Sequence, residues 1–186
     1  SDAGDVWLCV VDPGVGGGRL PIILDCGGVS FGGPDNGLFE IIYRRVPGAR
    51  RKTIEWRPDY LSATFHGRDL FAPVAAWLAC GEDVPGDDLD PSAERPGMDW
   101  PDDLAEIIYI DAYGNLITGI GGAALANGRS IRVGNNELQH AGTFSDVPEG
   151  ALFWHRNSSG LIEIAANKAR ADEYLAVLPG DFVEIV

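Results

Sequence analysis

The sequence has few of the features that mark membrane proteins or nucleic-acid-binding proteins. None of its 186 residues lies in an apolar run of about 18 residues, so no membrane-spanning helix is expected. Lys and Arg number only 14 against 28 Asp and Glu, and the formal net charge is −14. Binding of phosphates needs clustered Lys and Arg, so this balance argues against nucleic acid as a partner.

Cysteine is also scarce, and its spacing is not that of a metal-binding set. Cys9, Cys26 and Cys80 are far apart in the chain, and each lies among apolar residues. This pattern is typical of buried free thiols in a reducing compartment. No signal peptide is recognised at the start of the sequence. We therefore expect a cytoplasmic protein with no metal site.

The distribution of charge and proline predicts two domains. Residues 81–103 hold nine acidic residues, four prolines and a single base, Arg95. Such a composition is typical of a solvated linker. We therefore predict an α/β domain over residues 1–80, a linker over residues 81–103 and a second domain over residues 104–186.

The loop from Val10 to Arg19 is the most concentrated candidate site. An apolar run over residues 7–11 predicts a buried strand that ends at Asp12, and Pro13 and four glycines follow. In open α/β sheets, ligands bind beyond the carboxyl ends of strands. Glycine lets the backbone approach a ligand closely, and Arg19 adds a fixed positive charge. An acid, a bare backbone and an arginine together indicate a site.

A second candidate segment leads into a helix predicted over residues 69–80. Pro73 is compatible with that helix only near its first turn. His66 and Gly67 lie in the preceding turn, where backbone N–H groups favour an anion or a lone-pair ligand. A structural and a functional role for His66 are equally open at this point.

Other polar residues of the first domain have competing structural explanations. Asp35 and Asn36 precede an apolar segment, and their side-chain oxygens could cap a helix there. The basic residues between positions 44 and 52 have no interleaved aromatic residues, so we expect them on the surface. The pair Arg68 and Asp69 could simply form an ion pair that shapes its turn.

The second domain is predicted to consist mainly of short strands separated by turns. Strand-like pieces occupy residues 107–118, 130–133, 151–155, 161–165 and 182–186. This pattern favours a small β-barrel or sandwich, and residues 167–178 could form one helix. The polar residues of the turns include Asp111, Asn115, Asn157 and Ser158. Such residues often serve backbone geometry alone.

Together the motifs resemble those of the S-adenosyl-L-methionine (SAM) hydroxide adenosyltransferases, which are adenosine-forming SAM hydrolases related to fluorinating and chlorinating SAM enzymes. The matching motifs, in the order of the family, are Val11-Asp-Pro-Gly-Val-Gly with Arg19, Pro34-Asp-Asn-Gly37, Thr64-Phe-His-Gly-Arg-Asp69, Asp111-Ala-Tyr-Gly-Asn115 and Asn157-Ser-Ser-Gly160. The resemblance implies an N-terminal α/β domain and a C-terminal β-barrel domain. It also implies a homotrimer that holds SAM between the N-terminal domain of one subunit and the C-terminal domain of the next.

The resemblance also implies roles for individual residues. The water-activating triad of the family falls on Asp12, Arg19 and His66, in which Asp12 and a neutral His66 accept hydrogen bonds from the water while Arg19 orients Asp12. The Gly67 amide lies beside the nucleophile. The residues implied to bind SAM are Asp111, Asn115, Phe144, Asn157 and Ser158, with Phe144 as the candidate for stacking on adenine. SAM is then the substrate, and no metal or other cofactor is required.

The sequence differs from the family in one segment and from the halogenating relatives at single positions. The family begins with a strand and a Thr-Asp-Phe-Gly motif whose Asp holds the ribose hydroxyls, and this sequence has no matching segment. We therefore expect a missing N-terminal segment, or a second chain that supplies it, and a sheet that lacks its first strands. Halogenating relatives carry Trp at the position of Ile117, Tyr at that of Asp12 and Tyr-Ser at that of His66-Gly67.

The implied reaction is attack of water on the 5′ carbon of SAM, which gives adenosine and L-methionine. The carboxylate of Asp12 would repel a halide ion, which favours water as the nucleophile. Three alternatives stay open: a non-catalytic SAM- or nucleoside-binding protein, a SAM-dependent halogenase, and a metal-dependent phosphoesterase using Asp12, His66 and Asp69. The sequence lacks the dense His and Asp pattern that the phosphoesterase needs.

Overall fold

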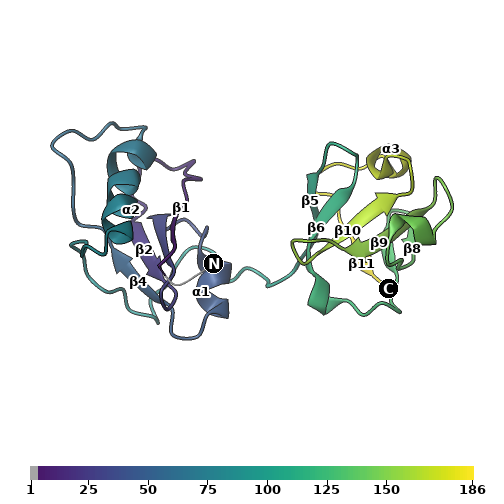
Figure 1. Ribbon diagram of the computed structural model, residues 1–186, viewed down its shortest axis with the longest axis horizontal. Coiled ribbons are helices and arrows are strands. Elements are labelled where there is room, and N and C mark those ends of the chain that lie inside the picture. The colour runs from purple at the N-terminus through teal and green to yellow at the C-terminus, as the bar shows by residue number, and fades with distance from the viewer. Residues whose placement is uncertain (1–3) are drawn as a thin grey trace. The chain divides into compact units, whose positions relative to one another are not determined.

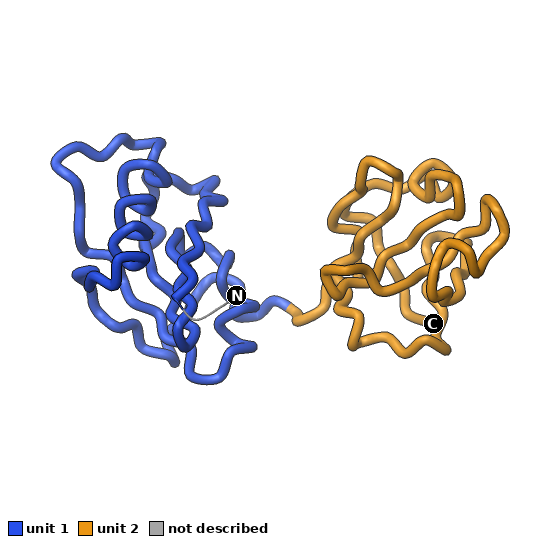
Figure 2. Tube along the Cα trace, in the orientation of Figure 1, with its two compact units in different colours: residues 1–100 blue, residues 101–186 orange. Residues whose placement is uncertain are grey.

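The computed structural model describes residues 4–186, which form two compact units (Figures 1 and 2). Unit 1 extends to Trp100, and unit 2 runs from Pro101 to Val186. The boundary therefore lies near the end of the acidic segment for which a linker is predicted. The chain is a mixed α/β protein in which strands predominate and helices are few and short. None of the helices in the described part of the chain has the length and hydrophobicity that crossing a membrane requires.

Unit 1 is built on a four-stranded mixed sheet with the strand order β1-β3-β2-β4. The strands are β1 (Val6–Leu8), β2 (Pro21–Asp25), β3 (Ser30–Pro34) and β4 (Arg50–Thr53). β1 runs parallel to β3, whereas β2 pairs antiparallel with both β3 and β4. The helical elements of this unit are α1 (Glu40–Arg45), the π-helical turn η1 (Gly67–Phe71) and α2 (Ala72–Ala79).

The alternating side chains of β2 hold the two layers of helix to the sheet. Ile22 and Leu24 point to one face, where they pack with Phe39 and the α1 region. Ile23 points to the opposite face and packs with Phe71 and Val74 at the start of α2. This period of two is what a central strand with two covered faces requires. β2 begins two residues after Arg19 and packs against the helical segment that follows His66.

The first strand is shorter and more exposed than the sequence predicts. The apolar run over residues 7–11 predicts a buried strand, but β1 ends at Leu8, and Trp7 and Val11 are 50% and 64% exposed. β1 lies at the edge of the sheet and pairs only with β3 among the described strands. A short apolar run has the same appearance in a buried strand and in such an edge strand, so hydrophobicity alone does not distinguish them.

Two further predictions about burial are wrong. Cys80 is exposed, because it lies at the C-terminal end of α2 where the helix leaves the sheet. Cys9 and Cys26 are partly buried, and burial raises the pKa of both thiols above the usual value. All three cysteines are free, as expected. Arg51 is buried and not on the surface, because β4 directs its side chain inward.

The inward side chain of Arg51 explains the position of Asp35. The two form an ion pair at 3.2 Å, and the Arg51 guanidinium lies 5.1 Å from the centre of the Tyr43 ring. Burial raises the pKa of Asp35, and the positive charge of Arg51 opposes that shift. No side chain caps α1, whose N-cap residue is Phe39. Asp35 therefore pairs with Arg51 and does not cap the helix.

The acidic, proline-rich segment after α2 packs on unit 1 for most of its length. Val84 is buried, and Arg95 forms an ion pair of 2.6 Å with the buried carboxylate of Glu40. Arg44 donates a hydrogen bond of 2.6 Å to the carbonyl oxygen of Trp100. These arginine contacts hold the segment against α1, a packing that its composition does not indicate.

Unit 2 contains two antiparallel sheets. The first has the order β5-β6-β10-β9, and its strands are β5 (Leu104–Ile110), β6 (Leu116–Gly121), β10 (Leu161–Ala166) and β9 (Leu152–Arg156). The second has the order β11-β7-β8, and its strands are β11 (Glu184–Ile185), β7 (Ile131–Val133) and β8 (Asn136–Leu138). The short helical elements are η2 (Gly122–Ala124), η3 (Phe144–Asp146) and α3 (Ala171–Leu175).

The strands of unit 2 agree with the predicted pieces, but the described strands do not close into a barrel. Isolated bridges join Glu106 to Phe182 and His140 to Trp154 across the gaps in pairing. Trp154 is fully buried in a core that both sheets share. The sequence does not predict β8, because Asn135 and Asn136 at its start resemble a turn. α3 is also shorter than the helix suggested for residues 167–178.

Candidate active site

Hydrogen bonds join the side chains of Asp12, Arg19 and His66 in unit 1. The Nε of Arg19 lies 3.0 Å from both carboxylate oxygens of Asp12, and its second terminal nitrogen, Nη2, also donates to that carboxylate. The same Nη2 lies 2.9 Å from Nδ1 of His66. The side chains of Arg19 and Asp12 are only 11% and 5% exposed. Arg19 therefore bridges the other two residues.

Two glycines allow the loop of Asp12 to approach the segment of His66. Gly16 has a φ of +78°, and a Cβ there would lie 2.9 Å from the carbonyl oxygen of Ala63. A Cβ at Gly67 would lie 2.8 Å from the Val10 side chain. Any larger residue would push the two segments apart, so the glycines set the spacing of the site.

Asn36 holds the Asp12 loop on its other side. Its Nδ2 donates a hydrogen bond of 2.9 Å to the carbonyl oxygen of Val11, the residue before Asp12. Its Oδ1 accepts a bond of 3.2 Å from the Leu38 N–H. The position of Asn36 before an apolar segment is compatible with a helix cap, and only its place in the Pro-Asp-Asn-Gly motif indicates any other role. Asn36 is a positioning residue for the loop.

Arg19 also packs against the hydrophobic core of unit 1. Its guanidinium carbon lies 5.5 Å from the centre of the fully buried Phe71 ring. A cation over an aromatic face gains about 0.5–2 kcal/mol, depending on how far it is desolvated. Phe71 ends η1, the turn that follows His66. The same packed element therefore supports Arg19 and presents His66.

The contact with Arg19 determines the protonation state of His66. A guanidinium only donates hydrogen bonds, so Nδ1 of His66 is the acceptor and the neutral ring carries its proton on Nε2. Burial, followed by the positive charge of Arg19, lowers the pKa of His66 below its usual 6.5, and Asp12 opposes this shift. His66 is therefore neutral at pH 7, and its Nε2–H is a hydrogen-bond donor.

Unit 2 contains a cavity of about 720 Å³ at which three of the predicted substrate residues meet. These residues are Asp111, Asn115 and Phe144. The charged side chains that complete the lining are Glu163, Lys168 and Arg170. The cavity brings residues from the Asp111–Asn115 motif together with Phe144 and with residues of the segment 163–170.

The turn-forming explanation holds for Asp111 and Asn157. The Asp111 carboxylate accepts hydrogen bonds from the N–H groups of Tyr113 and Asn115, at 2.8 and 2.9 Å. It also accepts one of 3.0 Å from the Asn115 side chain, and all these groups belong to its own turn. Asn157 caps its turn in the same way, and its Nδ2 donates to Glu163 at 3.2 Å. The Asp111 turn forms part of the cavity wall, whereas Asn157 is not among the residues that line the cavity.

The remaining predicted residues lie at different places. Ser158 is in the exposed turn between β9 and β10 and is not among the residues that line the cavity. Gly67 begins η1 in unit 1, next to His66. Arg68 and Asp69 pair with each other at 2.5 Å, and Asp69 accepts the Ser62 N–H, so this pair shapes the turn as expected.

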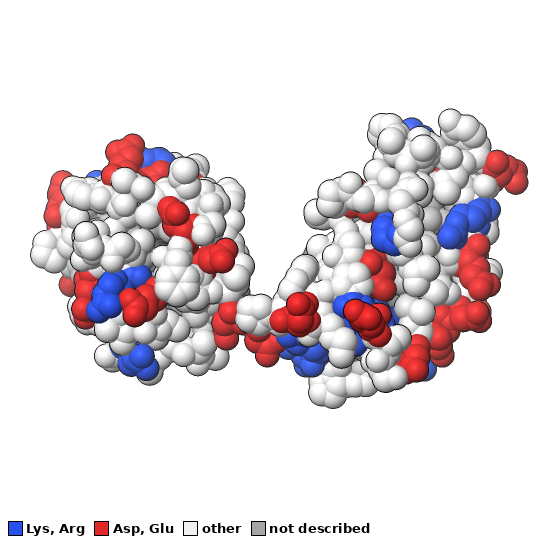
Figure 3. All heavy atoms as spheres, turned by 180° about the vertical axis from the view of Figure 1, so that it is seen from behind, with Lys and Arg blue, Asp and Glu red and all other residues white. Residues whose placement is uncertain are grey.

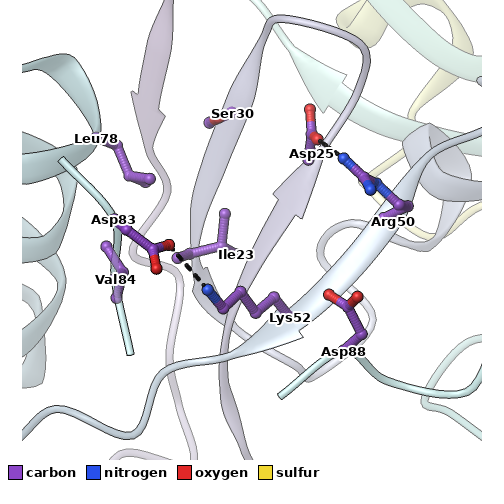
Figure 4. A pocket seen from close by; sticks show the side chains of 9 residues that line it. All are labelled: Ile23, Asp25, Ser30, Arg50, Lys52, Leu78, Asp83, Val84 and Asp88. Carbon is purple, nitrogen blue, oxygen red and sulfur yellow. Dashed lines mark hydrogen bonds and ion pairs between the residues drawn. The ribbon is translucent and has the colours of Figure 1, made fainter. Parts of the chain in front are cut away.

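A second cavity, of about 280 Å³, lies in unit 1 and contains none of the predicted site residues. Figure 4 shows ion pairs of Arg50 with Asp25 and of Lys52 with Asp83, each at 3.0 Å, and a further acid, Asp88, in the wall. Since both cations of the wall are already paired, we do not assign a ligand to this cavity.

Among residues 4–186, no three His, Cys, Asp or Glu side chains are grouped so that they could hold a metal ion. On the face shown in Figure 3, acidic side chains are scattered over both units with Lys and Arg between them. That the protein uses no metal cofactor and binds no nucleic acid stays a prediction.

Both halves of the chain match models of one protein family. Residues 2–86 match the SAM hydroxide adenosyltransferase N-terminal domain, and residues 105–184 match the C-terminal domain of the same family. The chain therefore belongs to the SAM hydroxide adenosyltransferase family.

Several known proteins are similar to this chain over most of its length. The (R)-S-adenosyl-L-methionine hydrolase of Salinispora arenicola is 41% identical over 97% of this chain and 74% of its own length. The protein of the same name from Thermus thermophilus is 36% identical over 95% of this chain and 74% of its own length. A solved structure of an uncharacterized conserved protein from Thermotoga maritima has a TM-score of 0.84 and 33% identity. It covers 98% of this chain and 77% of the other.

The electrostatic coupling in the site can be tested by titrating His66. We expect its pKa to lie below 6.5, to rise in Arg19→Gln and to fall in Asp12→Asn, because the Arg19 charge lowers it and the Asp12 charge raises it. Nuclear magnetic resonance of the ring protons measures the pKa, and His140→Gln and His155→Gln identify the other two signals. Equal His66 titration curves in all three proteins would show that the contact does not form.

Proposed function

We propose that this protein catalyses attack of water on the 5′ carbon of SAM and releases adenosine and L-methionine. The observation that carries the proposal is the hydrogen-bonded unit of Asp12, Arg19 and His66, which places a carboxylate acceptor beside a fixed cation and a neutral imidazole. Membership of the family and the relatives named (R)-S-adenosyl-L-methionine hydrolases support the same reaction. SAM is the substrate, and we propose no additional cofactor.

The chemistry needs a positioned nucleophile more than it needs an acid. As the water oxygen bonds to C5′, the C5′–S bond breaks and its electron pair stays on sulfur. The sulfonium leaves as the neutral thioether of methionine, so no group has to protonate it, and the water loses one proton. Holding the reactants in line contributes on the order of 7–11 kcal/mol in well-oriented cases.

The tautomer of His66 determines which residue donates a hydrogen bond to the water and which residue accepts one. The resemblance implies that both Asp12 and His66 accept hydrogen bonds from the water. Because Nδ1 of His66 already accepts from Arg19, we infer that Asp12 is the acceptor and that His66 donates from Nε2 to the water oxygen. A donor and an acceptor fix both the position and the orientation of the water. Arg19 keeps the Asp12 carboxylate aligned through its hydrogen bonds.

The charge of Asp12 also selects the nucleophile. A carboxylate 4 Å from a halide ion repels it by about 4 kcal/mol at an effective dielectric near 20. Water is neutral, and it is stabilised by donating a hydrogen bond to the same carboxylate. We therefore propose that the protein uses water and not a halide.

Identification of the products tests the reaction class. Incubation of purified protein with the two sulfonium epimers of SAM, without added metal, is expected to yield adenosine and methionine in chromatography with mass detection. The (R) epimer should react faster, as the names of the relatives indicate, and excess chloride or fluoride should give no 5′-halogenated adenosine. S-adenosylhomocysteine as the product would refute hydrolysis, and SAM binding without product would favour the non-catalytic alternative.

Substitution of the nucleophile-activating residues tests their roles. We expect Asp12→Ala and His66→Ala each to lower turnover by about 10²-fold or more, the scale of a positioned proton-transfer group. The SAM dissociation constant should change much less, because neither residue is proposed to hold the substrate. Asp83→Ala is the control, because that carboxylate is 91% exposed and has no proposed role in the reaction. Near-normal turnover in both site variants would contradict the assignment.

We also propose that the active form is a homotrimer in which SAM contacts both kinds of domain. The support is that the candidate residues are divided between the units, with the triad in unit 1 and the larger cavity in unit 2. The resemblance implies that neighbouring subunits supply the two parts. Light scattering combined with activity measurement checks this, and a fully active monomer would refute it.

A further inference from the structure

Of the two carboxylates that line the cavity, Glu163 retains the greater capacity to accept hydrogen bonds. It lies on β10, and its side chain is 12% exposed. Asp111, the other acid in the lining, already accepts three hydrogen bonds within its own turn. Glu163 accepts one protein hydrogen bond, on Oε2, from Nδ2 of Asn157. A carboxylate offers about four acceptor positions, so Glu163 has room for a ligand donor.

The second oxygen of Glu163 faces a histidine without forming a hydrogen bond to it. Oε1 lies 3.4 Å from Nε2 of His155, within the distance of an ion pair. That nitrogen is buried and forms no hydrogen bond with any described residue, since the geometry of the contact is unsuitable. The contact therefore leaves the hydrogen-bonding positions of Oε1 unoccupied by the described residues.

An aromatic wall stands beside this carboxylate. The Phe144 ring is 37% exposed and packs edge-on against Phe153, with ring centres 5.2 Å apart. Its centre is 5.7 Å from that of His155, the residue that also contacts Glu163. Phe144 and Glu163 both line the cavity. A flat ring stacked on Phe144 would therefore lie in the same cavity as the Glu163 carboxylate.

We propose that Glu163 reads the base of the substrate by accepting a hydrogen bond from the 6-amino group of adenine stacked on Phe144. An ionised carboxylate only accepts, so it favours an N–H donor at that edge. A purine without that donor leaves the carboxylate desolvated and unpaired. This assignment rests on the proposed function, because it needs the nucleoside part of SAM to bind in this cavity. Glu163 is then a specificity-determining residue, which the sequence motifs did not indicate.

Binding of two nucleosides tests the assignment without requiring turnover. Calorimetry compares adenosine with purine riboside, which carries hydrogen in place of the 6-amino group. The wild type should bind adenosine about 10- to 100-fold more tightly, the range for a hydrogen bond to a charged group. In Glu163→Ala the ratio should fall to near one, and in Glu163→Gln it should fall severalfold, because a neutral acceptor is weaker. Glu137→Gln, a half-exposed acid on β8, is the matched control and should keep the wild-type ratio.

The other outcomes overturn the assignment in distinguishable ways. If Glu163 has a purely structural role, its substitution would weaken the binding of both nucleosides equally and leave the ratio of their affinities unchanged. A role in holding the amino group of methionine would lower methionine affinity in Glu163→Gln and leave the nucleoside ratio intact. Failure of the wild type to bind either nucleoside would also refute it. SAM turnover, assayed on the same protein, reports separately on the proposed hydrolysis: base discrimination without turnover would refute only that reaction.

Discussion

The candidate active site depends on one guanidinium that binds a carboxylate and an imidazole at the same time. Arg19 contacts Asp12 through Nε and Nη2 and reaches His66 through the same Nη2. Both members of the ion pair are nearly excluded from water. Losing one partner of such a buried pair costs about 3–5 kcal/mol, because the remaining charge is left uncompensated. The fold around this contact is therefore arranged to keep all three residues in place.

Several independent restraints act on the loop that carries the carboxylate. Asn36 holds the carbonyl oxygen of Val11, Gly16 permits the close approach to Ala63, and β2 begins shortly after Arg19. A site whose side chains are fixed before the substrate arrives does not have to reorganise its dipoles during the reaction. This preorganisation matters most when the leaving group needs no assistance. The residues of the site then act on the water alone, which they orient and from which Asp12 accepts a hydrogen bond.

The motifs that carry the resemblance named Asp12, Arg19 and His66, and the structure brings these three side chains together. Their catalytic roles stay predictions. Other features depend on packing that spacing does not encode. The donor role of His66 follows from which ring nitrogen meets Arg19, and Glu163 matters only because Asn157 and His155 meet it across a turn. The edge position of β1 and the arginine contacts of the acidic segment likewise depend on elements distant in sequence.

The central claim is that a water molecule attacks C5′ of SAM. Reaction in water enriched in oxygen-18 tests it most directly, with mass spectrometry of both products. The account predicts one labelled oxygen in the 5′-hydroxyl group of adenosine and none in methionine. Adenosine without label, or a product in which the C5′–S bond is intact, would contradict it.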